Sequence, residues 1–310
     1  MLLVLGAITL NFLLIHLAPG DPALMLAGEA GGASEETLKA IRADFGLDEP
    51  LVQQLLVYVG KLGRGDFGFS YFYNASVLSL IGERVPQTML LASASLVFAW
   101  TVGLTFGVLV ARRPTSLGGN VLSVVSLFGY AMPVFWSAIM LLLLFAVKLP
   151  WFPTHGMTTV GLSGGLGARA LDVAHHLVLP MLSLGFIFIA IHSRLTRAGM
   201  VEVLASDYIR TARSKGLGEW RVVVVHALRN ALLPVITVAG IQLGQVVAGA
   251  ILVETVFSWP GMGRLAFDSI LRRDYPLLMG ILFFSSLAVI VFNFLTDICY
   301  GWLDPRIRYR

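Results

Sequence analysis

The chain has 310 residues, of which 57% are hydrophobic and only 13% are charged. Soluble domains usually carry about 25% charged residues, so this composition excludes an ordinary soluble protein and indicates a chain that mostly faces lipid. The net charge of +4 is small, and the basic residues lie at the edges of apolar segments, which argues against nucleic-acid binding. A single cysteine, Cys299, excludes an internal disulfide.

Six apolar segments approach the roughly 20 residues that a helix needs to cross a bilayer. They cover residues 1–17, 86–111, 119–147, 176–193, 231–253 and 277–302. The first lacks the basic start and the small-residue cleavage site of a signal peptide, so we expect a membrane helix there. The sequence predicts an all-α membrane protein with about six transmembrane helices.

The segment 18–85, between the first two apolar segments, is long and mixed enough to form a small subdomain outside the membrane. Ser34, followed by two acids, is typical of a helix start, and we expect this helix to end near Phe45, before Gly46. A second amphipathic helix is predicted over residues 51–62.

Lys and Arg placement predicts the orientation of the chain. With six alternating spans, twelve of the 22 basic residues fall on the side that holds both termini. We therefore expect both termini in the cytoplasm, the first helix at 1–17, an extracytoplasmic subdomain at 18–85, a membrane core at 86–302 and a cytoplasmic tail at 303–310.

The loop 196–230 is the longest on the positive side, yet its pattern is helical. Residues 200–214 and 219–232 each read as a helix, and Gly216 is a natural residue to end the first of them. Two short helices joined by a glycine turn can fit a partner's groove and transmit its displacement to the membrane helices.

Polar residues within apolar segments are candidates for a translocation pathway. Gln242 and Gln245 lie about one turn apart with Gly249 nearby, and uncharged amides suit a path that does not hold its cargo. Hydrogen bonding between helices is an equally good interpretation of the two amides.

In the third apolar segment, Pro133 lies between Tyr130 and Trp136. We expect Pro133 to bend that helix beside bulky side chains, which makes Tyr130 and Trp136 pathway candidates. His192 is expected at a membrane interface.

Two pairs of small residues have the spacing that lets membrane helices approach closely. They are Gly103 with Gly107 and Gly240 with Gly244. Chance spacing among 32 glycines is the alternative.

The sequence contains no G-x-x-x-x-G-K-[ST] motif and no His/Cys cluster at metal-ligand spacing. We therefore predict no catalytic residue, metal site or cofactor on this chain. A secondary transporter would need an ionisable group near the middle of the membrane, whereas Glu254 and Asp297 lie toward the ends of their segments. A channel stays possible on composition but does not account for the structured loop.

The segments Asp207–Leu217 and His226–Pro234 resemble the EAA loop of binding-protein-dependent ABC importer permeases. Ala212 and Gly216 keep the spacing of that pattern, while Arg210 and Thr211 stand where the general pattern has Glu and Ala. These departures resemble the first of the two permeases in the dipeptide/oligopeptide/nickel family.

Four further segments resemble the same family, in the same order along the chain. They are His16–Pro22, Glu254–Leu265, Arg273–Pro276 and Trp302–Arg306. The resemblance therefore extends from about His16 to Arg310.

The resemblance implies a type I ABC importer permease fold in a bacterial inner membrane. It implies as partners a second homologous permease, two cytoplasmic ATPases that hold ATP and Mg²⁺, and an extracytoplasmic substrate-binding protein. The substrates it implies are di- or oligopeptides, with nickel, glutathione or haem as alternatives.

The resemblance also implies which residues couple the chain to an ATPase. They are Tyr208, Arg210, Ala212, Arg213, Lys215, Gly216 and Leu217. Gly216 would supply the turn, and the three basic residues would pair with acids of the ATPase. The alternative for the basic residues is cytoplasmic charge placement alone.

Overall fold

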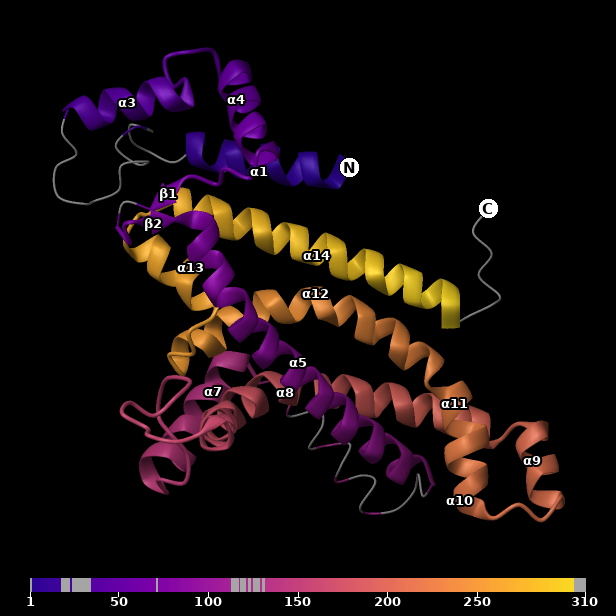
Figure 1. The fold of residues 1–310 in the computed structure, drawn as a ribbon. Coiled ribbons are helices and arrows are strands. Elements are labelled where there is room, and N and C mark those ends of the chain that lie inside the picture. The colour runs from indigo at the N-terminus through magenta and orange to yellow at the C-terminus, as the bar shows by residue number, and fades with distance from the viewer. Residues whose placement is uncertain are drawn as a thin grey trace. The chain divides into compact units, whose positions relative to one another are not determined.

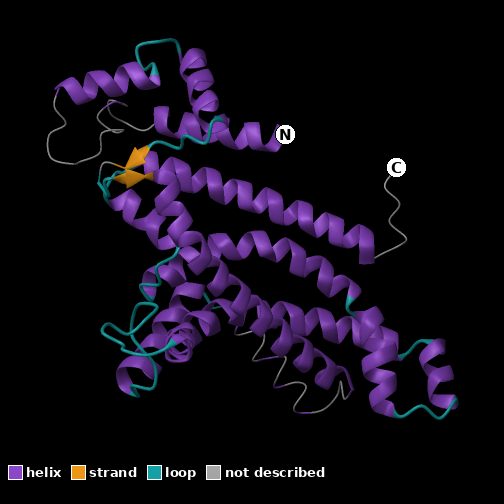
Figure 2. Ribbon diagram, viewed as in Figure 1, coloured by secondary structure: helices purple, strands orange, loops and turns teal. Residues whose placement is uncertain are grey.

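The computed structural model describes residues 2–17, 23, 35–70, 72–112, 117, 121, 124, 129 and 132–303. These residues are mostly helical, and their strands form one short hairpin (Figures 1 and 2). The chain divides into two compact units, Met1–Met89 with Trp259–Val291, and Leu90–Ser258 with Phe292–Arg310.

The first unit combines the amino-terminal elements with two later helices. They are α1 (Leu2–Leu17), α3 (Glu35–Phe45), α4 (Leu51–Gly63), β1 (Phe69–Ser70), β2 (Ala75–Ser76), the start of α5 (Val77–Arg112), α13 (Met262–Leu271) and the start of α14 (Tyr275–Leu303). The helices predicted at 35–45 and 51–62 are confirmed, and Gly46 has the positive φ of +61° that ends the first of them. Ser34 lies outside the described residues.

The packing of the first unit explains why the described part of 18–85 does not stand alone. Phe12 of α1 meets Tyr58 of α4 with ring centroids 6.1 Å apart, in a cluster that also includes Met279 of α14. In the hairpin, the buried hydroxyl of Ser70 donates to the carboxylate of Asp274, which also accepts from the amide of Leu277 at 3.2 Å. The described part of the predicted subdomain thus packs against the first part of α14, and a second cluster joins Phe67 and Tyr73 to α13 and α14.

The start of α5 is joined to the turn before α13 by two hydrogen bonds. The indole N–H of Trp259 donates to the carbonyl of Gln87 at 2.9 Å, and the amide of Met262 donates to the hydroxyl of Thr88 at 2.8 Å. Trp259 is fully buried. These contacts fix the first turn of α13 beside α5.

The second unit contains most of the long helix α5, two further long helices and the predicted cytoplasmic loop. Its elements are the rest of α5, α7 (Val134–Leu141), the π-helix η1 (Leu142–Lys148), α8 (Leu166–Leu204), α9 (Asp207–Ser214), α10 (Glu219–Arg221), the π-helix η2 (Val222–Ala227), α11 (Leu228–Ala231), α12 (Leu233–Val256) and the end of α14.

Among the described residues, three helices are long and apolar enough to cross a membrane, at Val77–Arg112, Leu166–Leu204 and Tyr275–Thr296. Shorter apolar helices lie at Val4–Leu13 and Val134–Lys148. The predicted third segment, 119–147, lies partly outside the described residues, so the number of six spans stays a prediction.

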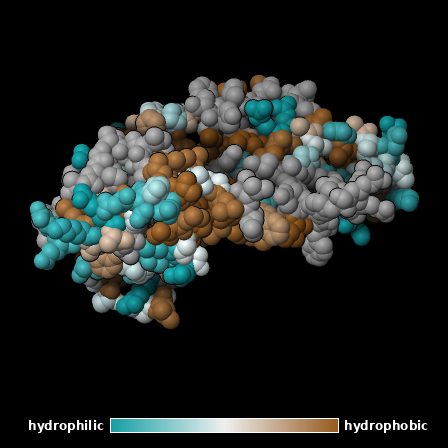
Figure 3. All heavy atoms as spheres, turned by 90° about the horizontal axis from the view of Figure 1, so that it is seen from above, coloured by the Kyte–Doolittle hydropathy of each residue, from teal (hydrophilic) through white to brown (hydrophobic). Residues whose placement is uncertain are grey.

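Large apolar side chains are exposed along the long helices. Val97 and Leu109 on α5 and Phe294 on α14 are each more than half exposed. Figure 3 shows such hydrophobic side chains, in brown, over a broad part of one face. An exposed apolar surface on helices of this length is what lipid contact requires.

Pro133 does not bend a helix as we had expected. It lies directly before Val134, the first residue of α7, with φ −59°. Proline lacks an amide proton and clashes with the preceding turn, so it is tolerated at a helix start, where no internal hydrogen bond is lost.

The prediction of close packing at Gly103 and Gly107 is confirmed. A Cβ atom on Gly107 would lie 2.4 Å from the Cβ of Thr196, and one on Gly103 would lie 2.8 Å from the Cβ of His192. Only glycine lets α5 and α8 approach this closely. The packing of Gly240 and Gly244 in α12 lies outside what the structure describes.

Candidate functional site

Residues 205–231 form two short helical arms after α8, and we call them the coupling subdomain after the role that the resemblance implies. Their sequence predicts one helix over 200–214, and this is wrong, because α8 ends at Leu204 and α9 begins at Asp207. Between them Ser206 has an extended backbone, and its hydroxyl donates to the carbonyl of Val203 at 2.6 Å. A serine that bonds the backbone locally favours a helix boundary over a continuous helix.

The first arm, α9, ends in the glycine turn that was predicted. Gly216 has φ +77°, the left-handed conformation that glycine adopts without a steric penalty. The amide of Leu217 donates to the carbonyl of Ala212 at 3.4 Å, and the amide of Gly216 donates to that of Arg213 at 2.9 Å. This pair of bonds is a Schellman motif, which satisfies carbonyls at the helix end.

The second arm runs from α10 through the π-helix η2 to α11, which confirms the helical character predicted for 219–232. The π-helical stretch replaces the expected α-helix over Val222–Ala227. Figure 1 shows α9 and α10 as two neighbouring short helices that lead into α11.

A buried apolar cluster joins the two arms to the membrane helices. Ile209 and Val222 are fully buried in it, together with Met200 of α8. Its other buried members are Ala111, Ala212, Val223, Ala227 and Ala231, and Leu217 packs against them. The cluster therefore packs α9 closely against α5 and α8.

Gly199 of α8 brings α11 against the same helix. A Cβ atom at Gly199 would lie 2.9 Å from the carbonyl oxygen of Ala231, so a larger residue would push the second arm away. The coupling subdomain is thus seated directly on α8.

The charged residues of the coupling subdomain differ in what they contact. Arg213 donates from Nη2 and Nε to the carboxylate of Glu219 at 2.8 and 3.1 Å, so it stabilises the turn internally. The hydrogen bond from Arg213 holds the pKa of Glu219 below its usual value. Arg210 lies 3.5 Å from Asp207 with both side chains exposed, and Lys215 is exposed.

Tyr208 and Trp220 present large side chains to solvent. Tyr208 is 44% exposed, and its hydroxyl accepts a hydrogen bond from Nδ2 of Asn230 at 2.8 Å, which holds α9 to α11. Trp220 is 74% exposed on α10. Exposed aromatic side chains on a rigid support are typical anchors of a protein interface.

Trp220, Glu219 and Asn230 were not among the predicted site residues. The apolar residues Val222, Val223 and Ala227 form the buried side of the second arm, so the sequence pattern could have placed the Trp220 indole on the outer side. The partners of Glu219 and Asn230 depend on how the two arms fold together, which no local pattern reveals.

The predicted pathway residues are only partly described. Gln242 is buried, and its Oε1 accepts a hydrogen bond from Nε2 of His192 at 2.7 Å, so α12 and α8 are joined as the alternative interpretation expected. His192 is fully buried, not interfacial as expected, because Gly103 allows α5 to cover it. Trp136 is 42% exposed on α7.

For the remaining pathway candidates, the structure does not describe what the side chains contact. Tyr130 lies outside the described residues, and Gln245 and Gly249 belong to α12 without described side-chain surroundings. The pathway role of all these residues stays a prediction.

The chain matches two protein-family models that together cover almost all of it. Residues 103–309 match the binding-protein-dependent transport system inner membrane component. Residues 1–92 match the amino-terminal part of a binding-protein-dependent transport system membrane component.

Named relatives align over nearly the whole chain. The di/tripeptide transport system permease protein DppB of Pseudomonas aeruginosa (strain UCBPP-PA14) is 44% identical, over 98% of this chain and 95% of its own length. The dipeptide transport system permease protein DppB of Escherichia coli (strain K12) is 40% identical, over 99% and 95%. The oligopeptide transport system permease protein AppB of Bacillus subtilis (strain 168) is 40% identical, over 99% and 96%.

The fold is similar to that of a solved transporter. A chain from an inward-facing structure of the MetNI methionine ABC transporter matches with a TM-score of 0.58 at 17% identity, covering 73% of this chain and 97% of that chain. This likeness confirms the expected type I ABC importer permease fold. The matched models and relatives show that the chain belongs to the family of inner-membrane components of binding-protein-dependent transport systems.

Proposed function

We propose that this chain is one of two permease subunits that form the translocation pathway of an ATP-driven importer of short peptides. The relatives support peptides as the substrate class. They are 40–44% identical over nearly the whole chain and are named di/tripeptide, dipeptide and oligopeptide permeases. These names do not favour nickel, glutathione or haem as cargo, nor a secondary transporter or channel.

In this proposal the coupling subdomain is the docking site for a cytoplasmic ATPase. The support is its geometry: exposed Tyr208 and Trp220 stand on arms whose buried cluster reaches α5 and α8. ATP and Mg²⁺ bind to the two ATPases, and this chain carries out no chemistry. A second permease and an extracytoplasmic binding protein complete the importer.

The orientation we propose has both termini in the cytoplasm and α3 and α4 outside. It is supported by the basic residues of the coupling subdomain, which favour the cytoplasmic side. An impermeant thiol reagent applied to whole spheroplasts should label a Lys39→Cys variant on α3, in a background with Cys299 replaced. Labelling only after lysis would reverse the orientation.

Reconstituted transport tests the function. The four-subunit complex in proteoliposomes, with its binding protein, should accumulate dialanine only with ATP on the cytoplasmic side. A Tyr208→Asp variant should lose ATPase subunits on purification while the chain still inserts, whereas a matched change outside the coupling subdomain, Trp151→Asp, should keep them. Uptake of dialanine at the same rate with and without ATP would contradict the proposal.

A further inference from the structure

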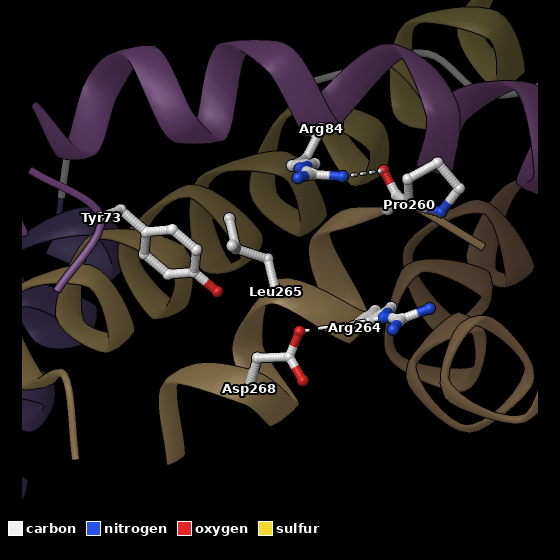
Figure 4. Close-up of a pocket in the computed structure, with 7 residues that line it drawn as sticks. Tyr73, Arg84, Pro260, Arg264, Leu265 and Asp268 are labelled. Carbon is white, nitrogen blue, oxygen red and sulfur yellow. Dashed lines mark hydrogen bonds and ion pairs between the residues drawn. The ribbon is translucent and has the colours of Figure 1, made fainter. Parts of the chain in front are cut away.

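A polar pocket lies within the first unit, between the hairpin, the start of α5 and α13. Its volume is about 220 Å³, and its lining includes Tyr73, Arg84, Pro260, Arg264 and Asp268. Figure 4 shows these side chains, which come from the hairpin, from α5 and from the segment that begins at Pro260 and enters α13. The function proposed above makes no use of this pocket.

Arg84 is the least satisfied charged group in this lining. Its Nη1 donates to the carbonyl of Pro260 at 3.4 Å, a long contact, and among the described residues its buried Nε has no hydrogen-bond partner. A guanidinium carries five N–H donors in a planar fork that matches a carboxylate. An under-satisfied guanidinium at the wall of a pocket strongly favours an anion that enters it.

Arg264 adds a second cation to the lining. Its Nε lies 3.8 Å from the carboxylate of Asp268, and both side chains are about one third exposed. The lining residues thus contribute two guanidiniums, those of Arg84 and Arg264, and one carboxylate, that of Asp268. The hydroxyl of Tyr73 points toward α13 in Figure 4, and burial raises the pKa of Tyr73, so the hydroxyl keeps its proton and can donate.

We propose that this pocket binds the free carboxylate of a short peptide, with Arg84 as the main ligand and Arg264 as the second. The proposal rests on the peptide-importer function and deepens it by naming a recognition point on the permease itself. The volume is below the roughly 300–1,000 Å³ of pockets for drug-sized ligands, so the site suits one end of a peptide. On the proposed orientation it belongs to the extracytoplasmic side.

The test compares dialanine with dialanine amide, which lacks the carboxylate, on the whole complex in lipid nanodiscs without the binding protein. Saturation-transfer NMR titrations give both affinities. We expect dialanine to bind at least about 10-fold more tightly than its amide, because a charge-assisted hydrogen bond contributes about 10- to 100-fold. Arg84→Gln should remove that preference, and Arg84→Lys should restore it in part.

Arg64→Gln is the matched control, since Arg64 is exposed at the end of α4 in the same unit and does not line the pocket. If Arg84→Gln lowers the unfolding temperature of the complex, the preference for dialanine over its amide is tested instead with Arg264→Gln, which changes the second guanidinium of the lining. Equal affinity for dialanine and its amide, or a preference that survives both substitutions, overturns the proposal.

A carboxylate of the binding protein is the competing occupant. If Arg84→Gln weakens association of the binding protein but leaves dialanine binding unchanged, the pocket is a protein-docking site and the proposal is wrong. ATP-driven dialanine uptake by the wild-type complex is measured separately. Failure of that uptake would contradict the importer function, whereas intact uptake with no carboxylate preference would overturn this inference alone.

Discussion

Arg213 and Glu219 face each other across the glycine turn of the coupling subdomain, joined by two hydrogen bonds of 2.8 and 3.1 Å. The pair links the end of α9 to the start of α10, so it holds the two arms at a fixed angle. Both side chains are nearly half exposed, and pairs of this kind contribute about 0–1 kcal/mol. The pair therefore sets local geometry more than global stability.

The first prediction concerns the pH dependence of this turn. The pKa of Glu219 is lowered in the folded state by the hydrogen bond from Arg213, so the stabilisation is present above the ordinary value of 4.5. It is lost as the pH falls below 4.5 through the folded-state pKa. Hydrogen exchange at residues 214–222, followed from pH 6 to about pH 3, should show protection falling in this window.

Glu219→Gln is the control for that experiment, because it removes the titrating group and keeps the shape. The variant should show no pH step in the same peptides after correction for intrinsic exchange. An identical step in the variant would assign the effect to another group.

The second prediction concerns Gly216. A Cβ atom at Gly216 would meet no described atom within 4 Å, so the cost of a substitution comes mainly from its φ of +77°. Gly216→Val should destabilise the turn by about 1–2 kcal/mol and reduce ATPase co-purification, because β-branched residues avoid this conformation. Gly216→Asn should be much milder, since asparagine tolerates left-handed backbone. Equal loss in both variants would point to a packing role instead.

The third prediction concerns the contact between α5 and α8. In Gly107→Ala the new Cβ would lie 2.4 Å from the Cβ of Thr196 and 2.9 Å from the carbonyl oxygen of Ser193. Overpacking of this kind costs about 1–3 kcal/mol, more than the gain of up to about 1 kcal/mol from helix propensity. The unfolding temperature in detergent should therefore fall.

Gly82→Ala is the matched control, because Gly82 lies on the same helix and a Cβ there would meet nothing within 4 Å. It should leave the unfolding temperature unchanged or raise it slightly. A similar fall in both variants would mean that helix flexibility matters, and not the approach of α8.

Local patterns predicted the features of this chain that depend on neighbours in sequence. The turn at Gly216, the helices α3 and α4, and the contact at Gly107 follow from glycine chemistry and apolar periodicity. The turn and the two helices are determined by residues within one or two helical turns, whereas the spacing of Gly103 and Gly107 indicated only one side of a helix contact and not its partner, Thr196.

Features that depend on distant segments were not predictable in this way. Hydrogen bonding between helices was one interpretation of Gln242, but its partner, His192, is 50 positions away and could not be named from the sequence. The pocket at Arg84 combines Tyr73 of the hairpin with residues of α5 and α13, which are far apart in the sequence. No single-segment pattern contains such pairings.

The last prediction concerns Trp220 as an anchor for the ATPase. An exposed indole on an arm whose next residues, Val222 and Val223, are buried is a typical hot spot, and its loss costs about 2–4 kcal/mol of binding. Trp220→Ala should therefore weaken ATPase binding by about 30-fold or more in a pull-down titration. Trp151→Ala, at an exposed tryptophan outside the coupling subdomain, should not weaken ATPase binding.

Tyr208→Phe removes only the hydroxyl that accepts a hydrogen bond from Asn230, so it should change ATPase binding by less than about 10-fold. If Trp220→Ala binds ATPase normally while Tyr208→Phe does not, the contact is carried by α9 and the second arm serves only as its support.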